Sequence, residues 1–425
     1  MLDIKILRDE PEKVKEKIAS KKADPTLVDR FLEVDGKWRV LSKETDDLRA
    51  EQKKKGEARD IEGAKALKET LKQKEEGLAA LESERIEIVK QIPNLPDDDV
   101  PLGNGEDDNK VIREVGSVPT FDFEVKDHLA LGEALGIIDV ETAGQVSGTR
   151  FGYLKGGAAL LEFAIIQHTL RMLREPEFLK RAAEQVRSDY PVTPFVPVIP
   201  PQMIRPEVYD RMDRLEPKDE RYHIPSDDMY LIGSAEHTLG PIYMDTILKE
   251  EELPIRLIGF STSFRREAGS YGKDTRGILR VHQFDKLEME SFTLPEHSRE
   301  EQDFIVALQE QLLQSLELPY QVMAVSTGDM GKPDARQIDI NTWMPGQNRY
   351  RETHTSDLMT DYQARRLNTR VRRNDGALQY VHMNDATAFA IGRILVAIIE
   401  NNQTKEGTVK IPSVLIPYVG TDTIG

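Results

Sequence analysis

The 425-residue sequence contains no cysteine. This absence excludes a disulfide framework, a thiolate nucleophile, an iron–sulfur cluster and every zinc site with a cysteine ligand. Long apolar runs are also missing: Leu2–Lys22 alternates charged with apolar residues, unlike a signal peptide, and no stretch reaches the roughly 20 apolar residues of a membrane span. The sequence therefore predicts a globular cytoplasmic protein of two or three domains, with no membrane partner.

Basic residues are fewer than acidic ones, 58 against 75, which gives a net charge of −17. Taken alone, this charge disfavours a nucleic-acid partner. The excess is uneven, however: residues 27–92 hold 15 basic and 16 acidic residues, whereas Phe264–Lys286 holds six basic and three acidic ones. Because contacts to phosphate are local, the overall charge does not exclude a nucleic acid.

Proline is absent from residues 27–92, and aromatic residues are almost absent there. Apolar residues recur in this region with heptad spacing, in two series: Val28, Phe31, Trp38, Leu41 and Leu48, then Leu67, Leu71, Leu78, Leu81 and Ile88. The spacing predicts two antiparallel helices joined near residues 56–62. At 1.5 Å per residue, they would form an arm about 45 Å long that projects from a body.

The remainder of the chain has a mixed texture. Residues 97–120 are acidic and are expected to form a surface connector. Beyond them, helices are predicted over 158–173, 300–316 and 388–402, and strands over 195–199, 229–232, 255–262, 280–292, 320–325, 338–343 and 379–383. Because these strands follow one another without regular crossover helices, we expect an α+β fold with a largely antiparallel sheet.

Arginine is concentrated around Phe264–Gly277, where a strand, a glycine-rich loop and a second strand predict a hairpin. Arg265 and Arg280 flank the loop, which adds Arg266, Lys273 and Arg276. Arginines at this density suit bidentate capture of phosphate or carboxylate, although a solvated hairpin tip is an equal alternative on charge alone.

Two glutamates shift that balance towards a binding site. Glu288 and Glu290 follow on one face of the second predicted strand, because residues two apart in a strand point the same way. A strand that carries such charges inside a sheet needs partners for them. A nucleoside triphosphate with a metal, together with an amino acid, would supply those partners.

Two later segments add candidates. Glu352 and Thr355 combine a carboxylate with a hydroxyl three residues on, which suits Mg²⁺ but also an ordinary polar turn. Asp385–Arg393 is rich in small residues and is predicted to open a helix. Arg393 lies on a strongly apolar stretch, where a buried arginine calls for an anion.

In this order, the three segments resemble motifs two and three of class II aminoacyl-tRNA synthetases, and the run FRREAGSYGKDTRGILRVHQFDKLE closely resembles that of the seryl-tRNA synthetase family. The resemblance extends over nearly the whole chain, including the predicted arm, Ser147–Glu162, Val198–Ile204 and the terminal IPSVLIPYVG. It implies a class II antiparallel sheet flanked by helices. It also implies a tRNA-binding domain over residues 1–100, with its arm over 27–92, and a catalytic domain over residues 101–425.

The family activates serine with ATP and transfers it to the 3′ end of tRNA(Ser), and generally to tRNA(Sec) where that tRNA exists. The resemblance implies ATP contacts by Arg265, Arg266, Glu267, Arg280, Val281, Phe284, Glu352, Thr353, His354, Thr355 and Arg393. It implies serine contacts by Ser234, Ala235, Glu236, Arg265, Glu288, Asp385 and Thr387. Catalytic roles are implied for Arg265, Arg393 and Glu352, Mg²⁺ ligation for Glu352 and Thr355, and tRNA contacts for the arm with Lys53, Lys54 and Lys55. The family is dimeric, with tRNA bound across subunits, and its zinc-dependent branch uses a cysteine that this chain lacks.

Several residues depart from the family pattern. Ser234 replaces the usual threonine, His237 replaces a small apolar residue, and Asp385 stands where bacterial members usually have asparagine, unless a one-residue shift places Asn384 there. Two other classes of function remain open. A ligase that loads an amino acid onto a carrier protein would lack the arm, and a non-catalytic paralog would have lost Arg265, Glu352 or Arg393.

Overall fold

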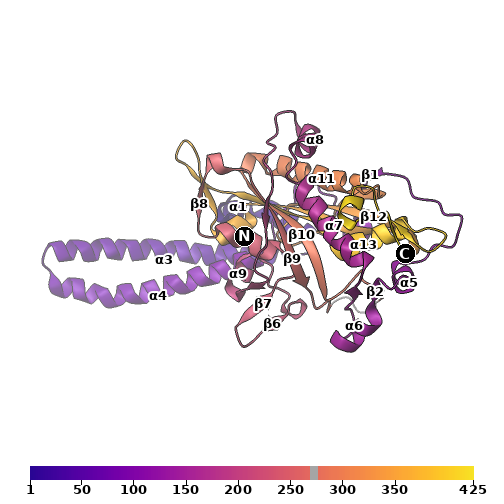
Figure 1. The fold of residues 1–425 in the computed structure, drawn as a ribbon. Coiled ribbons are helices and arrows are strands. Elements are labelled where there is room, and N and C mark those ends of the chain that lie inside the picture. The colour runs from indigo at the N-terminus through magenta and orange to yellow at the C-terminus, as the bar shows by residue number, and fades with distance from the viewer. Residues whose placement is uncertain (269–275) are drawn as a thin grey trace.

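The computed structural model describes residues 1–268 and 276–425, so the predicted loop residue Lys273 lies outside the described part. Helices α3 (Thr26–Glu57) and α4 (Ile61–Gln91) run antiparallel and project from the body (Figure 1). The short turn between them is closed by Asp60, whose side chain accepts a hydrogen bond from the Gly63 N–H at 2.9 Å and caps α4. The predicted arm and the position of its turn are confirmed.

The root of the arm has its own small core. Helices α1 (Ile4–Asp9) and α2 (Pro11–Ser20) pack against α3, and Phe31 and Ile88 of the heptad seam are buried there. The seam also encloses a charged group, because Asp35 is fully buried and pairs with Arg8 at 2.6 Å and Arg85 at 2.9 Å. These contacts fix the two helices to each other where they leave the body.

The body is built on an eight-stranded sheet. Its strand order is β1 (Lys110–Val115), β11 (Tyr320–Ala324), β12 (Arg336–Met344), β13 (Arg349–Thr360), β16 (His382–Ala390), β10 (Gln283–Thr293), β9 (Ile255–Phe264) and β4 (Val196–Val198). Neighbouring strands are antiparallel except for the parallel pair of β4 and β9. The prediction of an α+β fold with a largely antiparallel sheet is confirmed.

Three sequence-based assignments were wrong. The segment containing Glu352 and Thr355 belongs to the twelve-residue strand β13, not to a turn. Asp385 lies within strand β16, and the helix predicted from residue 388 begins only at Ile391. The acidic connector over 97–120 contains the edge strand β1. In each case sheet pairing overrides a local sequence that is polar or rich in small residues.

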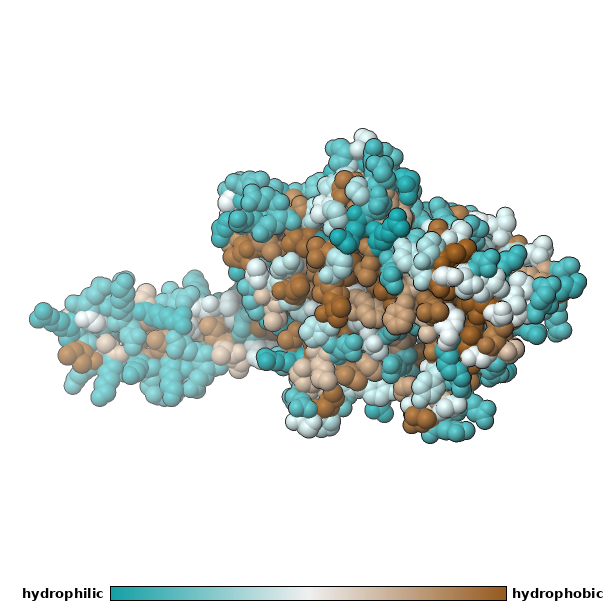
Figure 2. Space-filling view, viewed as in Figure 1, coloured by the Kyte–Doolittle hydropathy of each residue, from teal (hydrophilic) through white to brown (hydrophobic). Residues whose placement is uncertain are grey.

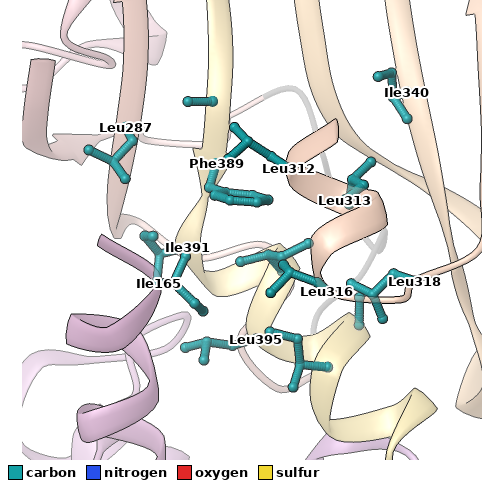
Figure 3. Close-up of a cluster of buried hydrophobic side chains, with 14 of the residues drawn as sticks. Ile165, Leu287, Leu312, Leu313, Leu316, Leu318, Ile340, Phe389, Ile391 and Leu395 are labelled. Carbon is teal, nitrogen blue, oxygen red and sulfur yellow. The ribbon is translucent and has the colours of Figure 1, made fainter. Parts of the chain in front are cut away.

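Helices α11 (Ser298–Ser315) and α13 (Ile391–Asn401) pack against the sheet, and α7 (Gly157–Met172) packs against α13. All three helices contribute side chains to the main core. Figure 3 shows Leu312 of α11 beside Phe389 of β16, while Leu313 lies on the side of the helix nearer Ile340 of β12. Truncating one such leucine to alanine costs about 2–5 kcal/mol, so this layer holds the strands in register beneath the site.

Shorter elements complete the fold. The helices are α5 (His128–Ala134), α6 (Val140–Ser147), α8 (Pro176–Val186), α9 (Pro206–Arg211), α10 (Glu236–Leu239), α12 (Tyr362–Leu367) and α14 (Ile416–Val419). The strands are β2 (Ile138–Asp139), β3 (Tyr153–Leu154), β5 (Met203–Ile204), β6 (His223–Ile224), β7 (Met229–Leu231), β8 (Ile247–Lys249), β14 (Arg370–Arg372), β15 (Leu378–Tyr380), β17 (Val409–Lys410) and β18 (Thr423–Ile424). Within the described residues, every helix is too short or too polar to span a membrane.

The arm is joined to the body by buried hydrogen bonds. The Asn94 side-chain amide donates to the carbonyl oxygens of Pro333 at 2.9 Å and Met359 at 2.8 Å, and the Tyr362 hydroxyl donates to the Ile92 carbonyl oxygen at 2.9 Å. The Lys21 ammonium donates to the carbonyl oxygens of Gly331 and Asp334 at 2.7 and 2.8 Å. Because these groups are mostly buried, their hydrogen bonds fix the direction in which the arm leaves the body.

Candidate active site

A pocket with about 650 Å³ of empty space opens over the sheet, between β10, β13 and the start of α13. Its lining residues come from segments more than 120 positions apart: Arg265, Glu267, Ile278, Leu279, Arg280, Val281, Phe284, Lys286, Glu352, Thr353, Thr355, Thr387, Ala390, Gly392 and Arg393. The structure therefore gathers most of the residues assigned to ATP by resemblance into one pocket.

Arg265 is held in place from several sides, directly after β9. Its backbone N–H donates to the His282 carbonyl oxygen at 3.0 Å, and its Nε donates to the Gly233 carbonyl oxygen, also at 3.0 Å. Its guanidinium carbon lies 5.4 Å from the centre of the Phe284 ring. A cation next to an aromatic face suits a nucleotide, which presents both phosphate and a flat base.

Two ion pairs cross the pocket walls. Arg393 Nη1, in the first turn of α13, lies 2.7 Å from Glu352 Oε1, and Arg280 Nε lies 3.0 Å from Glu267 Oε2. Desolvation opposes ionisation of Glu352, but Arg393 holds the pKa of this carboxyl below its ordinary value. Glu267 has a positive φ of 53°, an uncommon backbone conformation for a residue with a side chain. Such positions concentrate at binding sites.

Two β-bulges decide which side chains reach the pocket. On β13, Glu352 faces Asn341 of β12 while His354 faces Ile340, so Thr353 is an extra residue. This bulge lets Glu352, Thr353 and Thr355 all line the pocket, although regular alternation would separate 352 from 355. A second bulge on β16, between Thr387 and Phe389, puts Thr387 in the pocket and Phe389 in the core.

Two of the residues assigned to ATP lie outside the pocket lining. The Arg266 guanidinium lies over the Tyr222 ring, 5.7 Å from its centre. His354 is buried beneath β13, with its Nδ1 2.8 Å from Thr353 Oγ1 and its ring against Phe389. Burial lowers the pKa of His354 to about 3, so this imidazole is neutral at physiological pH and acts as a packing residue.

Of the residues assigned to serine, Arg265 and Thr387 line the pocket. All of them except Arg265 are buried: Ser234, Ala235, Glu236, Glu288, Asp385 and Thr387. Lys286, which sequence reasoning missed, connects two of these residues. Its Nζ lies 3.0 Å from Ser234 Oγ and 2.6 Å from Glu288 Oε2. The signal was the alternation of Lys286, Glu288 and Glu290 along β10, which places three ionisable groups on one face.

The carboxyls here have divergent pKa values. Desolvation works against ionisation of Glu236, but Lys286 and Arg214 hold its pKa below the ordinary value. Burial raises the pKa of Glu288 to about 8 and that of Asp385 to about 6, with neighbouring carboxylates adding to the shift. Among these three carboxyls, Glu236 is thus the one that stays ionised most readily.

The structure resolves the choice between Asn384 and Asp385. Asp385 stands opposite Glu290 of β10 and Asp357 of β13, and its Oδ2 lies 3.2 Å from Arg214 Nη2. Thr387, two residues along the same strand face, lines the pocket. Asn384 points to the other face of the sheet, so the chain carries a carboxylate, not an amide, on the pocket side.

The lysines assigned to tRNA lie at the far end of the arm. Lys53 and Lys54 are exposed near the C-terminus of α3, and Lys55 lies 3.5 Å from Glu51. That end of α3 is the tip of the arm, at the far end from the sheet (Figure 1). Most of the arm surface around them is hydrophilic (Figure 2).

Comparison with known proteins places these features in a family. Residues 1–96 match the seryl-tRNA synthetase N-terminal domain, and residues 220–402 match the class II tRNA synthetase core domain of the G, H, P, S and T enzymes. Curated proteins named serine–tRNA ligase are 41% identical in Acidothermus cellulolyticus and 39% identical in Thermobifida fusca, over 100% of this chain and 99% of each relative.

Solved structures give the same result. Seryl-tRNA synthetase from Pyrococcus horikoshii, complexed with ATP, has a TM-score of 0.91 and 35% identity, covering 100% of this chain and 99% of that one. Cytoplasmic serine–tRNA ligase from Naegleria fowleri, in complex with AMP, has a TM-score of 0.89 and 31% identity, covering 100% and 98%. The match confirms the resemblance read from the motifs: this chain belongs to the seryl-tRNA synthetase family.

Proposed function

We propose that this protein is a serine–tRNA ligase, which activates L-serine with ATP and transfers the seryl group to the 3′ end of tRNA(Ser). One observation carries the proposal. Arg265, Glu352 and Arg393, from three distant segments, line a single pocket in a chain that matches serine–tRNA ligases from end to end. The proposed site of action is the cytoplasm, and tRNA(Sec) is a further substrate wherever it exists.

The pocket accounts for the first half-reaction. A carboxylate oxygen of serine attacks the α-phosphorus of ATP, the bond to the pyrophosphate oxygen breaks, and seryl-adenylate and pyrophosphate form. Arg265 holds the α-phosphate and Arg393 the γ-phosphate, while Phe284 stacks on adenine. No general base is needed, because positioning and charge neutralisation lower the barrier to in-line displacement.

The remaining ATP contacts are proposed for Glu267, Arg280, Val281, Thr353 and Thr355, all of which line the pocket. Glu352 and Thr355 fit a Mg²⁺ ion, since they offer hard oxygen ligands on one wall. Among residues 1–268 and 276–425, no three His, Asp or Glu side chains converge into a metal cluster. A Mg²⁺ ion here would therefore take most of its ligands from phosphate and water, and would neutralise charge on the pyrophosphate.

The buried end of the site accounts for the amino acid. Glu236 receives the ammonium of serine, and Glu288 and Thr387 receive its hydroxyl. A site built around a hydroxyl rejects alanine, because its own buried polar groups would be left without a partner. In the second step the terminal ribose hydroxyl attacks the seryl carbonyl carbon, and AMP leaves.

The arm accounts for the binding of tRNA. We assign tRNA binding to residues 1–100, with Lys53, Lys54 and Lys55 among the phosphate contacts, and catalysis to residues 101–425. A homodimer that binds tRNA across its subunits fits the surface of the body. Strand β4 is the last strand of the sheet, and large apolar side chains are exposed there, with Val196 at 56% and Ile199 at 85%. An uncovered apolar edge of this kind is typical of an interface.

The test is ATP–pyrophosphate exchange by the purified protein with each of twenty amino acids. Exchange that depends on serine, followed by charging of tRNA(Ser), is the expected result. Exchange without charging of any tRNA would favour loading of a carrier protein. No exchange with any amino acid would favour a non-catalytic paralog and contradict the proposal.

A further inference from the structure

We infer that Arg214 is a positioning residue of the amino-acid site, which holds the Asp385 carboxylate in place as one wall of the serine pocket. The inference rests on the proposed function and deepens it. Arg214 would keep Asp385 from competing with Glu236 for the substrate ammonium. Sequence reasoning did not single out Arg214, because it follows α9 and lies 171 positions from its partner.

The contact between the two residues is direct and largely shielded from water. Arg214 Nη2 lies 3.2 Å from Asp385 Oδ2, and the two side chains are 18% and 3% exposed. The backbone of Arg214 is itself fixed, because its carbonyl oxygen accepts a hydrogen bond from Arg221 Nε at 3.0 Å. The Arg221 guanidinium in turn lies over the Tyr209 ring. Arg214 is therefore held from both ends.

The surroundings explain why a cation is needed at this point. Carboxyls face the group from several elements: Glu236 from α10, Glu288 and Glu290 from β10, Asp357 from β13, Asp385 from β16, and Asp334 from the turn before β12. The positive charge of Arg214 acts on Asp385, Asp334, Asp357, Glu236 and Glu290. Lys286 faces Glu236 and Glu288 from the other side, Lys21 faces Asp334, and burial keeps His237 neutral.

Loss of one cation from such a cluster should have a directed effect. Without Arg214, Asp385 would either take up a proton or attract the ammonium of serine towards itself. Both outcomes move the substrate away from Glu236 and spoil the line between its carboxylate and the α-phosphorus. An asparagine at position 385 would need no counterion. In this chain the carboxylate and the arginine form a matched pair.

The experiment is steady-state ATP–pyrophosphate exchange with Arg214→Gln, Asp385→Asn and the double variant. We expect Arg214→Gln to raise the KM for serine at least tenfold, while the KM for ATP stays within twofold. Asp385→Asn should raise the KM for serine less than Arg214→Gln does, because the amide keeps the shape of the wall and needs no counterion. The double variant should return to within threefold of the wild type, because neither unpaired charge remains. Arg211→Gln is the matched control: this arginine lies on α9 and pairs with Asp245 at the surface, at 2.9 Å.

Two results would overturn the inference: an unchanged serine KM in Arg214→Gln, or a double variant no better than Arg214→Gln. If Arg214→Gln does not fold, the KM for serine is measured instead in the double variant and in Arg214→Lys. A folded double variant with normal serine KM supports the pairing, and a raised serine KM in it contradicts the pairing. If the wild type exchanges with an amino acid other than serine, the proposed function fails, and the same variants measured with that amino acid still test the pair.

Discussion

The arm and the active-site sheet are both dense in charge, but they place that charge in opposite environments. On the arm most ion pairs are exposed, as for Lys37 and Glu33, whose side chains are 60% and 68% exposed. In the sheet, Glu288 and Glu290 are buried. Exposed pairs contribute about 0–1 kcal/mol each, whereas removing one partner of a buried pair costs several kcal/mol. Charge density in a sequence therefore says little until burial is known.

The arm and the sheet also differ in the pKa values of their buried carboxyls. The one deeply buried carboxylate described at the arm root, Asp35, has a lowered pKa, because Arg8 and Arg85 outweigh its desolvation. Glu288 has a raised pKa because desolvation outweighs Lys286. Asp35 therefore stabilises the fold as an anion, whereas Glu288 is favoured in its protonated form. Ionised Glu288 lowers the stability of the site, while the arm root contains no such destabilising carboxylate among the residues described here.

The largest expected effect is loss of activation in Arg265→Ala. The variant should fold normally but lower serine-dependent exchange by about 10³-fold or more, because a preorganised cation at the reacting phosphate would be lost. Exchange rates measure the loss of activation, and circular dichroism checks that the variant folds. Arg372→Ala, an exposed arginine on β14, is the control and should keep full activity. Normal exchange in Arg265→Ala would refute its phosphate role.

Next in size is a stability effect at the arm root. Asp35→Ala should destabilise the arm by about 3 kcal/mol, because Arg8 and Arg85 would lose a shared buried partner. Trp38 reports the change, since the Arg85 guanidinium lies over its ring at 4.1 Å. Asp46→Ala, at an exposed pair with Arg49, should cost less than about 0.5 kcal/mol. Equal losses in both variants would contradict the comparison.

The sign of the pH dependence follows from the lowered pKa of Asp35. Its stabilisation is fully present above the unfolded pKa of about 4 and is lost as the pH falls through the folded value. The difference in stability between wild type and Asp35→Ala should therefore shrink below pH about 4. A difference that is constant with pH would show that the lost packing, not the charge, matters.

Removing the outer arm should lower tRNA charging by about 100-fold, because phosphate contacts supply much of the affinity for a nucleic acid. Residues 43–76 can be replaced by a short glycine-rich turn, which keeps Phe31, Asp35 and Ile88 at the arm root. Serine-dependent exchange should be unchanged. Undiminished charging would show that the arm does not bind tRNA.

Glu288→Gln should raise stability while it impairs serine activation. Because the pKa of Glu288 is raised to about 8, the folded state binds more protons than the unfolded state between pH about 4.5 and 8, so stability falls as the pH rises across this window. The variant lacks this slope, so its advantage should grow by about 1.4 kcal/mol for each pH unit between pH 5 and pH 8. Denaturant unfolding at both pH values measures it. A parallel pH dependence in the two proteins would show that Glu288 is already ionised.

The smallest effect is expected from Lys53→Gln with Lys54→Gln at the arm tip. These exposed lysines should leave stability unchanged and weaken tRNA charging about fivefold, with a shallower salt dependence because fewer counterions are released. Lys37→Gln, nearer the root, is the control. An unchanged salt slope would exclude the pair from phosphate contact.

The arm could be predicted almost fully from sequence, because its helices depend on local spacing and a simple seam. The sheet could be predicted in class but not in detail. Strand β13 is polar and β16 is rich in small residues, and both acquire their structure only from neighbouring strands. The bulges at Thr353 and near Ala388 depend on this pairing. No local sequence pattern predicts that these two bulges place His354 in the interior and Thr387 in the pocket.

The candidate site shows the same division. Residues within the arginine-rich motif could be assigned from the chain itself and from its resemblance. Lys286 was missed because a lysine on a strand usually indicates a solvated face. Arg214 was missed because its role depends on its contact with Asp385, which is distant in the sequence. Residue spacing cannot predict pairs that come together only in the tertiary structure.

The buried attachment of the arm through Asn94 and Tyr362 has a mechanical consequence. At 1.5 Å per residue, the 31 residues of α4 form a lever about 45 Å long, so a tilt of 5° at the root displaces the tip by about 4 Å. That is more than the length of a hydrogen bond. The accuracy with which the tip lysines meet a partner is therefore set at the opposite end of the arm, by hydrogen bonds to the carbonyl oxygens of Pro333, Met359 and Ile92.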